Sequence, residues 1–126
     1  MGLCLFALDG DVDGPDAGWS YGRFADFRRR LAAAEGFTLD EMVGFGGDRK
    51  WSTVQTALEP LLDHPDDDGE LSSADCAAVA TRLAEIIEGW TADNPGPALI
   101  QQIGTARDLV TVMVLCIAKG VPLAFG

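Results

Sequence analysis

Two long stretches with apolar residues at helical spacing, in the second half of the chain, most constrain its fold. Apolar side chains three and four residues apart lie on one face of a helix. The segment "TADNPGP" at 91–97 separates the two stretches and has the composition of a loop. They predict two long amphipathic helices, although the β-branched residues of 109–117 leave a strand open there. The first set is Cys76, Val79, Ala80, Leu83, Ile86, Ile87 and Trp90, and the second is Leu99, Ile103, Ala106, Val110, Met113, Val114 and Ile117.

The first half of the chain carries weaker helix signals. Ser20 is a favourable cap for a helix over 20–35, and a capping-box pattern predicts a short helical turn at 38–41. Apolar residues at helical spacing predict another helix over 51–62. Pro60 should kink or shorten that helix, because proline has no N–H to donate.

The two ends of the chain favour strands. Residues 2–8 form a short apolar run, and 121–125 look extended, with Pro122 tolerated near the start of an edge strand. The segment 9–18 is expected to be a loop. Two terminal strands in a short chain most economically pair with each other. The expected fold is therefore α+β and mainly α, a single domain over 1–126 with four to five helices and a small pairing of the terminal strands.

The net charge limits the kinds of binding partner, and the cysteine content indicates the cellular compartment. The chain has 20 acidic and 9 basic residues, a net charge of −11, which argues against nucleic acid and anionic membranes as partners. The scattered Cys4, Cys76 and Cys116 are typical of buried free thiols in a reducing cytosol. The apolar run at 109–118 is shorter than the about 20 residues that span a bilayer. We therefore expect a cytoplasmic protein.

The stretch "HPDDDGELSSAD" at 64–75 is the sharpest chemical signal. It follows the spacing of a twelve-residue EF-hand loop, in which carboxylates and one backbone carbonyl bind a divalent cation. Gly69 stands at the sixth position, where the turn requires glycine, and Leu71 at the eighth, which normally anchors the loop in the core. The candidate ligands are His64 at the first position, Asp66 at the third, Asp68 at the fifth, Glu70 at the seventh through its carbonyl, and Asp75 at the twelfth.

Two of these positions depart from the EF-hand pattern. His64 replaces an aspartate, and imidazole is a poor ligand for a hard cation; Asp75 replaces the longer glutamate. An aspartate at the twelfth position does not exclude calcium binding. The run "DDDGELSSADCAAVATRL" resembles a dockerin half-repeat, which is a calcium loop that ends in aspartate. Repulsion among the six acidic residues between 63 and 75 favours bound Ca²⁺ or Mg²⁺. A turn that leads into a helix needs no metal, however, and a vestigial, metal-free loop is the preferred interpretation.

Three other motifs carry alternative hypotheses. Asp9 and Asp11 follow the first predicted strand and resemble the carboxylate pair of haloacid-dehalogenase-like phosphatases, which implies a magnesium-dependent enzyme; an acidic loop is the simpler interpretation. The glycine-rich segment 44–49 lacks the lysine and hydroxyl residues of a phosphate loop and is read as a connector. The arginines at 28–30 are a solvated helix face, a docking patch, or an intramolecular counterpart of the acidic loop.

Segments spread over most of the chain resemble a group of small bacterial, chiefly actinobacterial, proteins. They are "SYGRFADFRRRLA", "GFGG", "LLDHPDDDGELSSADC" and "GVPLAF", and the central loop of that group is also of the form H-x-D-x-D-G. The resemblance implies no activity. We expect a non-enzymatic binding or accessory domain with an EF-hand-like loop. The alternative is an interaction module that uses an acidic face to bind a protein partner without metal.

Overall fold

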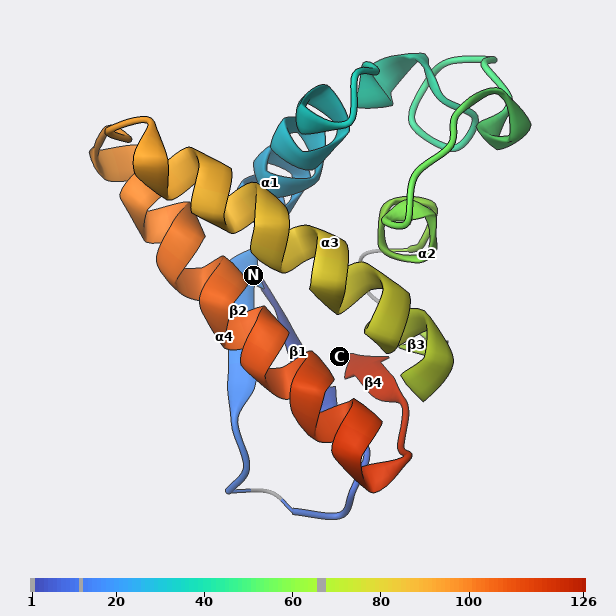
Figure 1. Ribbon diagram of the computed structural model, residues 1–126. Coiled ribbons are helices and arrows are strands. Elements are labelled where there is room, and N and C mark those ends of the chain that lie inside the picture. The colour runs from blue at the N-terminus through green and yellow to red at the C-terminus, as the bar shows by residue number, and fades with distance from the viewer. Residues whose placement is uncertain (1, 12, 66–67) are drawn as a thin grey trace.

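The computed structural model describes residues 2–11, 13–65 and 68–126. The fold is α+β and mainly α, as predicted: 55% of the chain is helical, and four α-helices accompany a four-stranded antiparallel sheet in the described residues (Figure 1). The elements are β1 (Gly2–Ala7), β2 (Asp16–Ser20), α1 (Tyr21–Ala34), α2 (Glu59–Leu62), β3 (Glu70–Leu71), α3 (Ser73–Ala92), α4 (Pro97–Lys119) and β4 (Leu123–Phe125), with 3₁₀ turns at Leu39–Glu41 and Trp51–Thr53.

The two long helices α3 and α4 form a hairpin that covers one face of the sheet (Figure 1). Ser72 caps α3, since its Oγ accepts a hydrogen bond of 3.1 Å from the N–H of Asp75. α4 ends at Gly120, whose φ of +64° is left-handed, as expected of a glycine stop. The segment 109–117 is therefore helical, because its side chains fill the core: Leu109, Val112, Met113 and Cys116 are fully buried.

The terminal strands pair with each other, which confirms that prediction, at the centre of a sheet with the order β2-β1-β4-β3. β4 is not the expected edge strand, because β3 pairs with its other side. The expected loop over 9–18 is also wrong at its end, where β2 begins at Asp16 and pairs with β1. Local sequence does not reveal either error, since β2 and β3 are strands only because they pair with β1 and β4.

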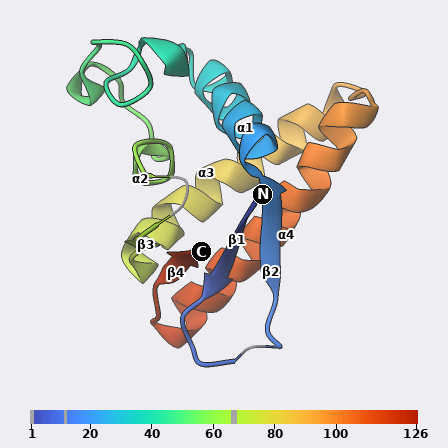
Figure 2. The same cartoon turned by 180° about the vertical axis from the view of Figure 1, so that it is seen from behind.

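The sheet has one covered and one open face. Side chains alternate along a strand, so Leu3, Leu5 and Ala7 of β1 are buried toward the helices. Phe6 points the opposite way and is 37% exposed. In Figure 2 the strands β1 and β2 lie in front of α4, and no helix covers them from that side. We call this side the outer face.

The helix expected over 51–62 is broken, and this prediction is wrong. The 3₁₀ turn that starts at Trp51 gives way to extended backbone at Val54, and only the four residues of α2 are α-helical. Thr56 interrupts the helix, because its Oγ1 accepts from the N–H of Leu58 at 3.0 Å and donates to Glu35 at 2.7 Å. The helix that precedes the acidic loop is therefore a single turn.

In the first half of the chain, α1 closely follows the predicted helix. The Oγ of Ser20 accepts from the N–H of Arg23 at 3.2 Å, which is the expected cap. The buried face of α1 includes Phe24 and Phe27, which pack beside the Trp19 ring. The short turn expected at 38–41 is the 3₁₀ turn Leu39–Glu41.

All three cysteines are free, as expected, and two of them are buried. Burial and the neighbouring thiol of Cys116 raise the pKa of Cys76 to about 12. Cys4 is only half-buried, on the outer face of β1. Partial burial and the nearby Asp16 carboxylate raise its pKa too, so the thiolate form is disfavoured at each of these sites.

α4 is long and apolar enough to cross a membrane by length and composition alone. Its most apolar 18-residue window has a mean hydropathy of 1.3, and 33% of that window is buried in the fold. Core helices of soluble domains have the same length and composition. Here the apolar side of α4 packs against α3 and the sheet.

Candidate functional site

His64, at the first position of the EF-hand-like loop, is folded inward. Its ring stacks on Phe125 of β4, with 4.0 Å between the ring centroids. Its Nε2 lies 3.2 Å from the carbonyl oxygen of Glu70 and its Nδ1 2.7 Å from that of Pro65. Carbonyl oxygens only accept hydrogen bonds, so a neutral ring donates to one of them and an imidazolium to both. The Glu70 carbonyl is the group that binds the cation in a working EF-hand loop.

Arg28 of α1 holds the start of the same loop from the other side. Its guanidinium donates to the carbonyl oxygen of His64 at 2.6 Å and to that of Leu62 at 3.3 Å. The residue is 4% exposed, and its Cζ lies over the rings of Phe24 and Phe45. Of the three arginines at 28–30, this one is the intramolecular counterpart of the loop, and it contacts backbone carbonyls.

Gly69 and Leu71 have the backbone conformation and the burial expected of their positions in the motif. Gly69 has a φ of +95°, the backbone conformation that the sixth position demands. A side chain there would also meet the His64 ring, 3.2 Å from the ideal Cβ position. Leu71 is 2% exposed and anchors the loop in the core, as expected of the eighth position.

The remaining predicted ligands are not gathered. Asp68 binds the N–H of Gly69 through its Oδ1 at 2.8 Å, and the Glu70 and Asp75 side chains are exposed at the start of β3 and in the first turn of α3. Asp66 lies outside the described residues. Across residues 2–11, 13–65 and 68–126, no three His, Cys, Asp or Glu side chains are placed to hold a metal ion.

The first acidic loop, which contains Asp9 and Asp11, is fixed by side-chain contacts of its own. The carboxylate of Asp9 accepts from the N–H of Asp11 at 2.9 Å and from the Nζ of Lys119 at 2.7 Å. The hydrogen bond from Lys119 is the main reason that the pKa of Asp9 lies below its ordinary value. The carboxylate of Asp11 in turn accepts from the N–H of Asp13 at 3.0 Å.

A row of four side chains crosses the outer face. Phe6 of β1 pairs with Asp16 of β2 on one side and with Ala124 of β4 on the other. Ala124 pairs in turn with Glu70 of β3. Paired residues in a sheet project to the same face, so the row has an apolar centre with a carboxylate at each end. Phe6 and Leu8 also line a concavity of about 360 Å³ beside the first acidic loop.

Sequence reasoning missed the aromatic and edge partners of the central loop. Phe125 lies at the end of β4, 61 residues after His64, and no spacing rule relates them. Glu70 lies on the outer face because it belongs to β3, a strand of two residues that is too short to show an alternating pattern in the sequence. The arginine run was a usable signal, since an intramolecular contact with the acidic loop was one of its three interpretations.

Comparison with known proteins gives no relative. No protein-family model, curated protein or solved structure matches the chain. The resemblance to small actinobacterial proteins thus stays a prediction, and the function must be argued from the fold and its surfaces.

Proposed function

We propose that this chain is a non-enzymatic protein-interaction domain that binds its partner on the outer face of the sheet. The row Asp16, Phe6, Ala124 and Glu70 is the observation that carries this proposal. Phe6 is 37% and Leu8 43% exposed, and both project from a face that no helix covers in Figure 2. Exposed apolar residues gathered within a polar rim are typical of interaction surfaces.

The charge around this face selects a basic partner. Asp9, Asp11 and Asp16 line the concavity beside Phe6, and Glu70 bounds the other side of the row. With a net charge of −11, the chain attracts cationic segments at long range. The partner expected here is a segment in which an apolar side chain fills the concavity and neighbouring lysines or arginines face the carboxylates.

In this proposal the central loop is a structural element that works without metal. It supplies β3, and through β3 it places Glu70 on the outer face. His64 supports a metal-free loop, because its ring nitrogen faces the carbonyl that a cation would need. A cation at the first position would have to displace the ring from Phe125.

A titration with a synthetic peptide that alternates lysine and leucine tests the binding surface. We expect backbone amide signals of Phe6, Leu8 and Asp16 to shift in NMR spectra at low salt, and the affinity to fall as salt is added. Phe6→Ser should weaken binding about tenfold, because the apolar anchor is lost.

Ile100→Ser is the matched control for that variant. Ile100 is an exposed apolar residue, 56% accessible, near the start of α4 and away from the row. Its replacement should leave the affinity unchanged. Signal changes that avoid β1, or equal losses in both variants, would reject the outer face as the binding surface.

Thermal unfolding of metal-stripped protein tests the loop independently. With about 1 mM calcium and a site of about 10 μM affinity, linkage would stabilise the fold by about 2.7 kcal/mol. We expect the midpoints in calcium, in magnesium and in EDTA to agree. A rise of several degrees that disappears in Asp68→Ala would instead establish a working cation site at 64–75.

A further inference from the structure

A second concavity, of about 540 Å³, lies at the opposite end of α4 from the one beside Phe6. Its walls come from three elements: the end of β2, the exposed side of α1 and the first turns of α4. Most of the side chains that line it are polar. Those that matter here are Ser20, Arg23, Asp26, Arg30, Gln101 and Thr105.

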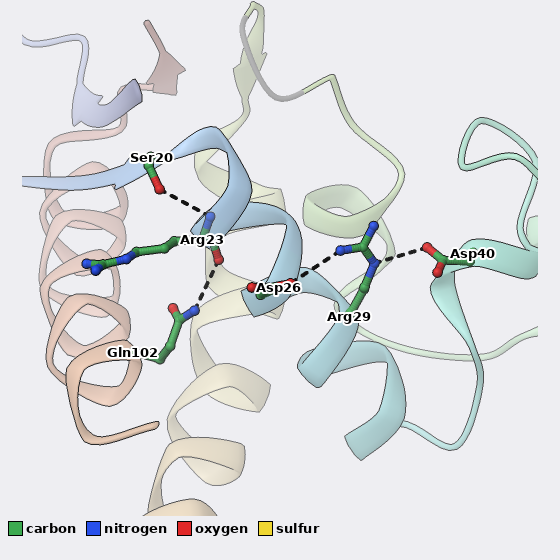
Figure 3. A network of polar contacts seen from close by, with 6 residues as sticks. All are labelled: Ser20, Arg23, Asp26, Arg29, Asp40 and Gln102. Atoms are coloured by element: carbon green, nitrogen blue, oxygen red, sulfur yellow. Dashed lines mark hydrogen bonds and ion pairs between the residues drawn. The ribbon is translucent and has the colours of Figure 1, made fainter. Parts of the chain in front are cut away.

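A buried hydrogen-bond chain fixes the floor of this cavity. The indole N–H of Trp19 donates to the Oε1 of Gln102 at 2.9 Å, and the Nε2 of Gln102 donates to the carbonyl oxygen of Arg23 at 3.1 Å. Gln102 is 8% exposed, so both ends of its amide are used inside the fold. These two bonds join β2, α4 and α1, and the three walls are therefore held in one arrangement. Figure 3 shows the contact between Gln102 and Arg23.

The two arginines of the cavity contrast with their neighbour Arg29. Arg29 is paired with Asp26 at 3.3 Å and with Asp40 at 3.1 Å. Within the described parts of the chain, the guanidinium groups of Arg23 and Arg30 form no ion pair or hydrogen bond. In Figure 3 the Arg23 side chain extends to the α4 side, whereas Arg29 reaches the other way to Asp40. Both Arg23 and Arg30 are exposed, so their guanidinium groups are accessible to a ligand in the cavity.

The spacing of the two arginines defines what they would recognise together. They are seven residues apart on α1, which is two turns or about 10 Å along the helix axis. Asp26 lies between them, so a single compact anion over the centre would meet a negative charge. Ala98, in the first turn of α4, adds the positive end of a helix dipole to the same cavity.

We propose that this cavity binds a small organic anion whose two oxyanion groups, carboxylate or phosphate, are held by Arg23 and Arg30. Guanidinium groups bind either kind of oxyanion in bidentate fashion. Gln101 and Ser20 line the space between α4 and α1 and offer hydrogen bonds to hydroxyl groups on the connecting chain. This site is independent of the partner surface proposed above.

Isothermal titration calorimetry of the whole chain with three probes tests the proposal. The probes are adipate, fructose 1,6-bisphosphate and inorganic phosphate, which differ in oxyanion type and in number of anionic groups. We expect saturable binding of adipate, of fructose 1,6-bisphosphate or of both, tighter than that of inorganic phosphate, with a shift of the Trp19 indole N–H signal in NMR spectra. The tighter of these two probes identifies the preferred oxyanion.

Three glutamine variants provide the controls. Arg23→Gln and Arg30→Gln should each weaken binding about tenfold or more, because each removes one charge-assisted contact. Lys50→Gln removes the same charge from an exposed residue that neither lines the cavity nor pairs with Asp26, and it should leave the affinity unchanged. Absence of saturable binding by both adipate and fructose 1,6-bisphosphate, or equal weakening by Lys50→Gln, would overturn the proposal.

Discussion

The two aspartate-rich loops of this protein, at 9–14 and 64–75, are held in different ways. In the first, the exposed Lys119 pairs with the carboxylate of Asp9, and the other contacts bind backbone N–H groups to aspartate oxygens. In the second, the ring of His64 and the guanidinium of Arg28 face backbone carbonyls, against aromatic rings. The first loop is therefore held through its carboxylates, and the second through backbone carbonyls.

The two loops differ in which of their groups the neighbouring side chains contact. A lysine can neutralise a carboxylate directly, and a pair whose lysine is open to solvent contributes little. Alternatively, cationic or polar donors can satisfy the backbone carbonyls, and the aspartates then remain solvated. The second way depends on buried contacts, so we expect substitutions there to have the larger effects.

The largest expected effect is that of Arg28→Ala. It leaves the carbonyls of Leu62 and His64 without their donor and opens space between Phe24 and Phe45. The free energy of unfolding should fall by about 3 kcal/mol, measured by urea denaturation. Arg29→Ala, an exposed neighbour in surface ion pairs, should cost less than about 1 kcal/mol. Equal losses in the two variants would contradict the buried role of Arg28.

His64→Asp should have the next largest effect and should also change the chemistry of the loop. Without metal, loss of the Phe125 stack and of the contact with Glu70 should lower stability by about 1–2 kcal/mol. The new carboxylate restores the usual first ligand, so calcium should raise the midpoint of this variant and leave the parent unchanged. His64→Phe keeps the stack and should lose less. A His64→Asp variant as stable in EDTA as the parent would show that the contacts of the His64 ring with Phe125 and Glu70 do not stabilise the fold.

Lys119→Met should have the smallest effect, seen mainly in the titration of Asp9. NMR of the carboxyl carbon should give Asp9 a pKa below the ordinary value of about 3.9, and the variant should move it upward. Because the pKa is lowered in the fold, the pair contributes stability above that ordinary value and loses it as the pH falls through the lowered pKa. Lys50→Met removes the same charge elsewhere, so an equal shift there would point to net charge instead of the pair.

Much of the helical architecture is predictable from local sequence. The periodicity of α1 and α3 reflects one buried face each, and Ser20 and Gly120 mark helix ends by side-chain and backbone chemistry. The apolar face predicted for α4 is only partly right, because Val114 and Ile117 are exposed and Leu109, Val112 and Cys116 are buried instead. The strands β2 and β3 gave no such signal. "DAGWS" and "EL" become strands because β1 and β4 lie beside them, and tertiary context of this kind overrides local preference. The broken helix over 51–62 has a local cause, the hydrogen bonds of Thr56, that apolar spacing does not reveal.

The central loop divides in the same way. The roles of Gly69 and Leu71 followed from the motif, since a left-handed turn and a buried anchor belong to its backbone. The orientation of His64 could not be predicted, because it depends on Phe125, which reaches the loop only through strand pairing. The spacing of the motif thus predicted the turn at Gly69 and the burial of Leu71, but not that the His64 ring would face the loop's carbonyls.

The position of β4 between β1 and β3 sets an order of events as the chain is made. The β1–β2 hairpin and the α3–α4 hairpin join neighbours in sequence and can form early, whereas β4 follows β1 by more than a hundred residues. Until residues 123–125 have left the ribosome, β3 has no strand partner, and His64 has no Phe125 ring to stack on. The contacts of His64 and β3 are therefore among the last in the domain to form, and until then the edge of β1 that β4 will cover is open to chaperones and to premature partners.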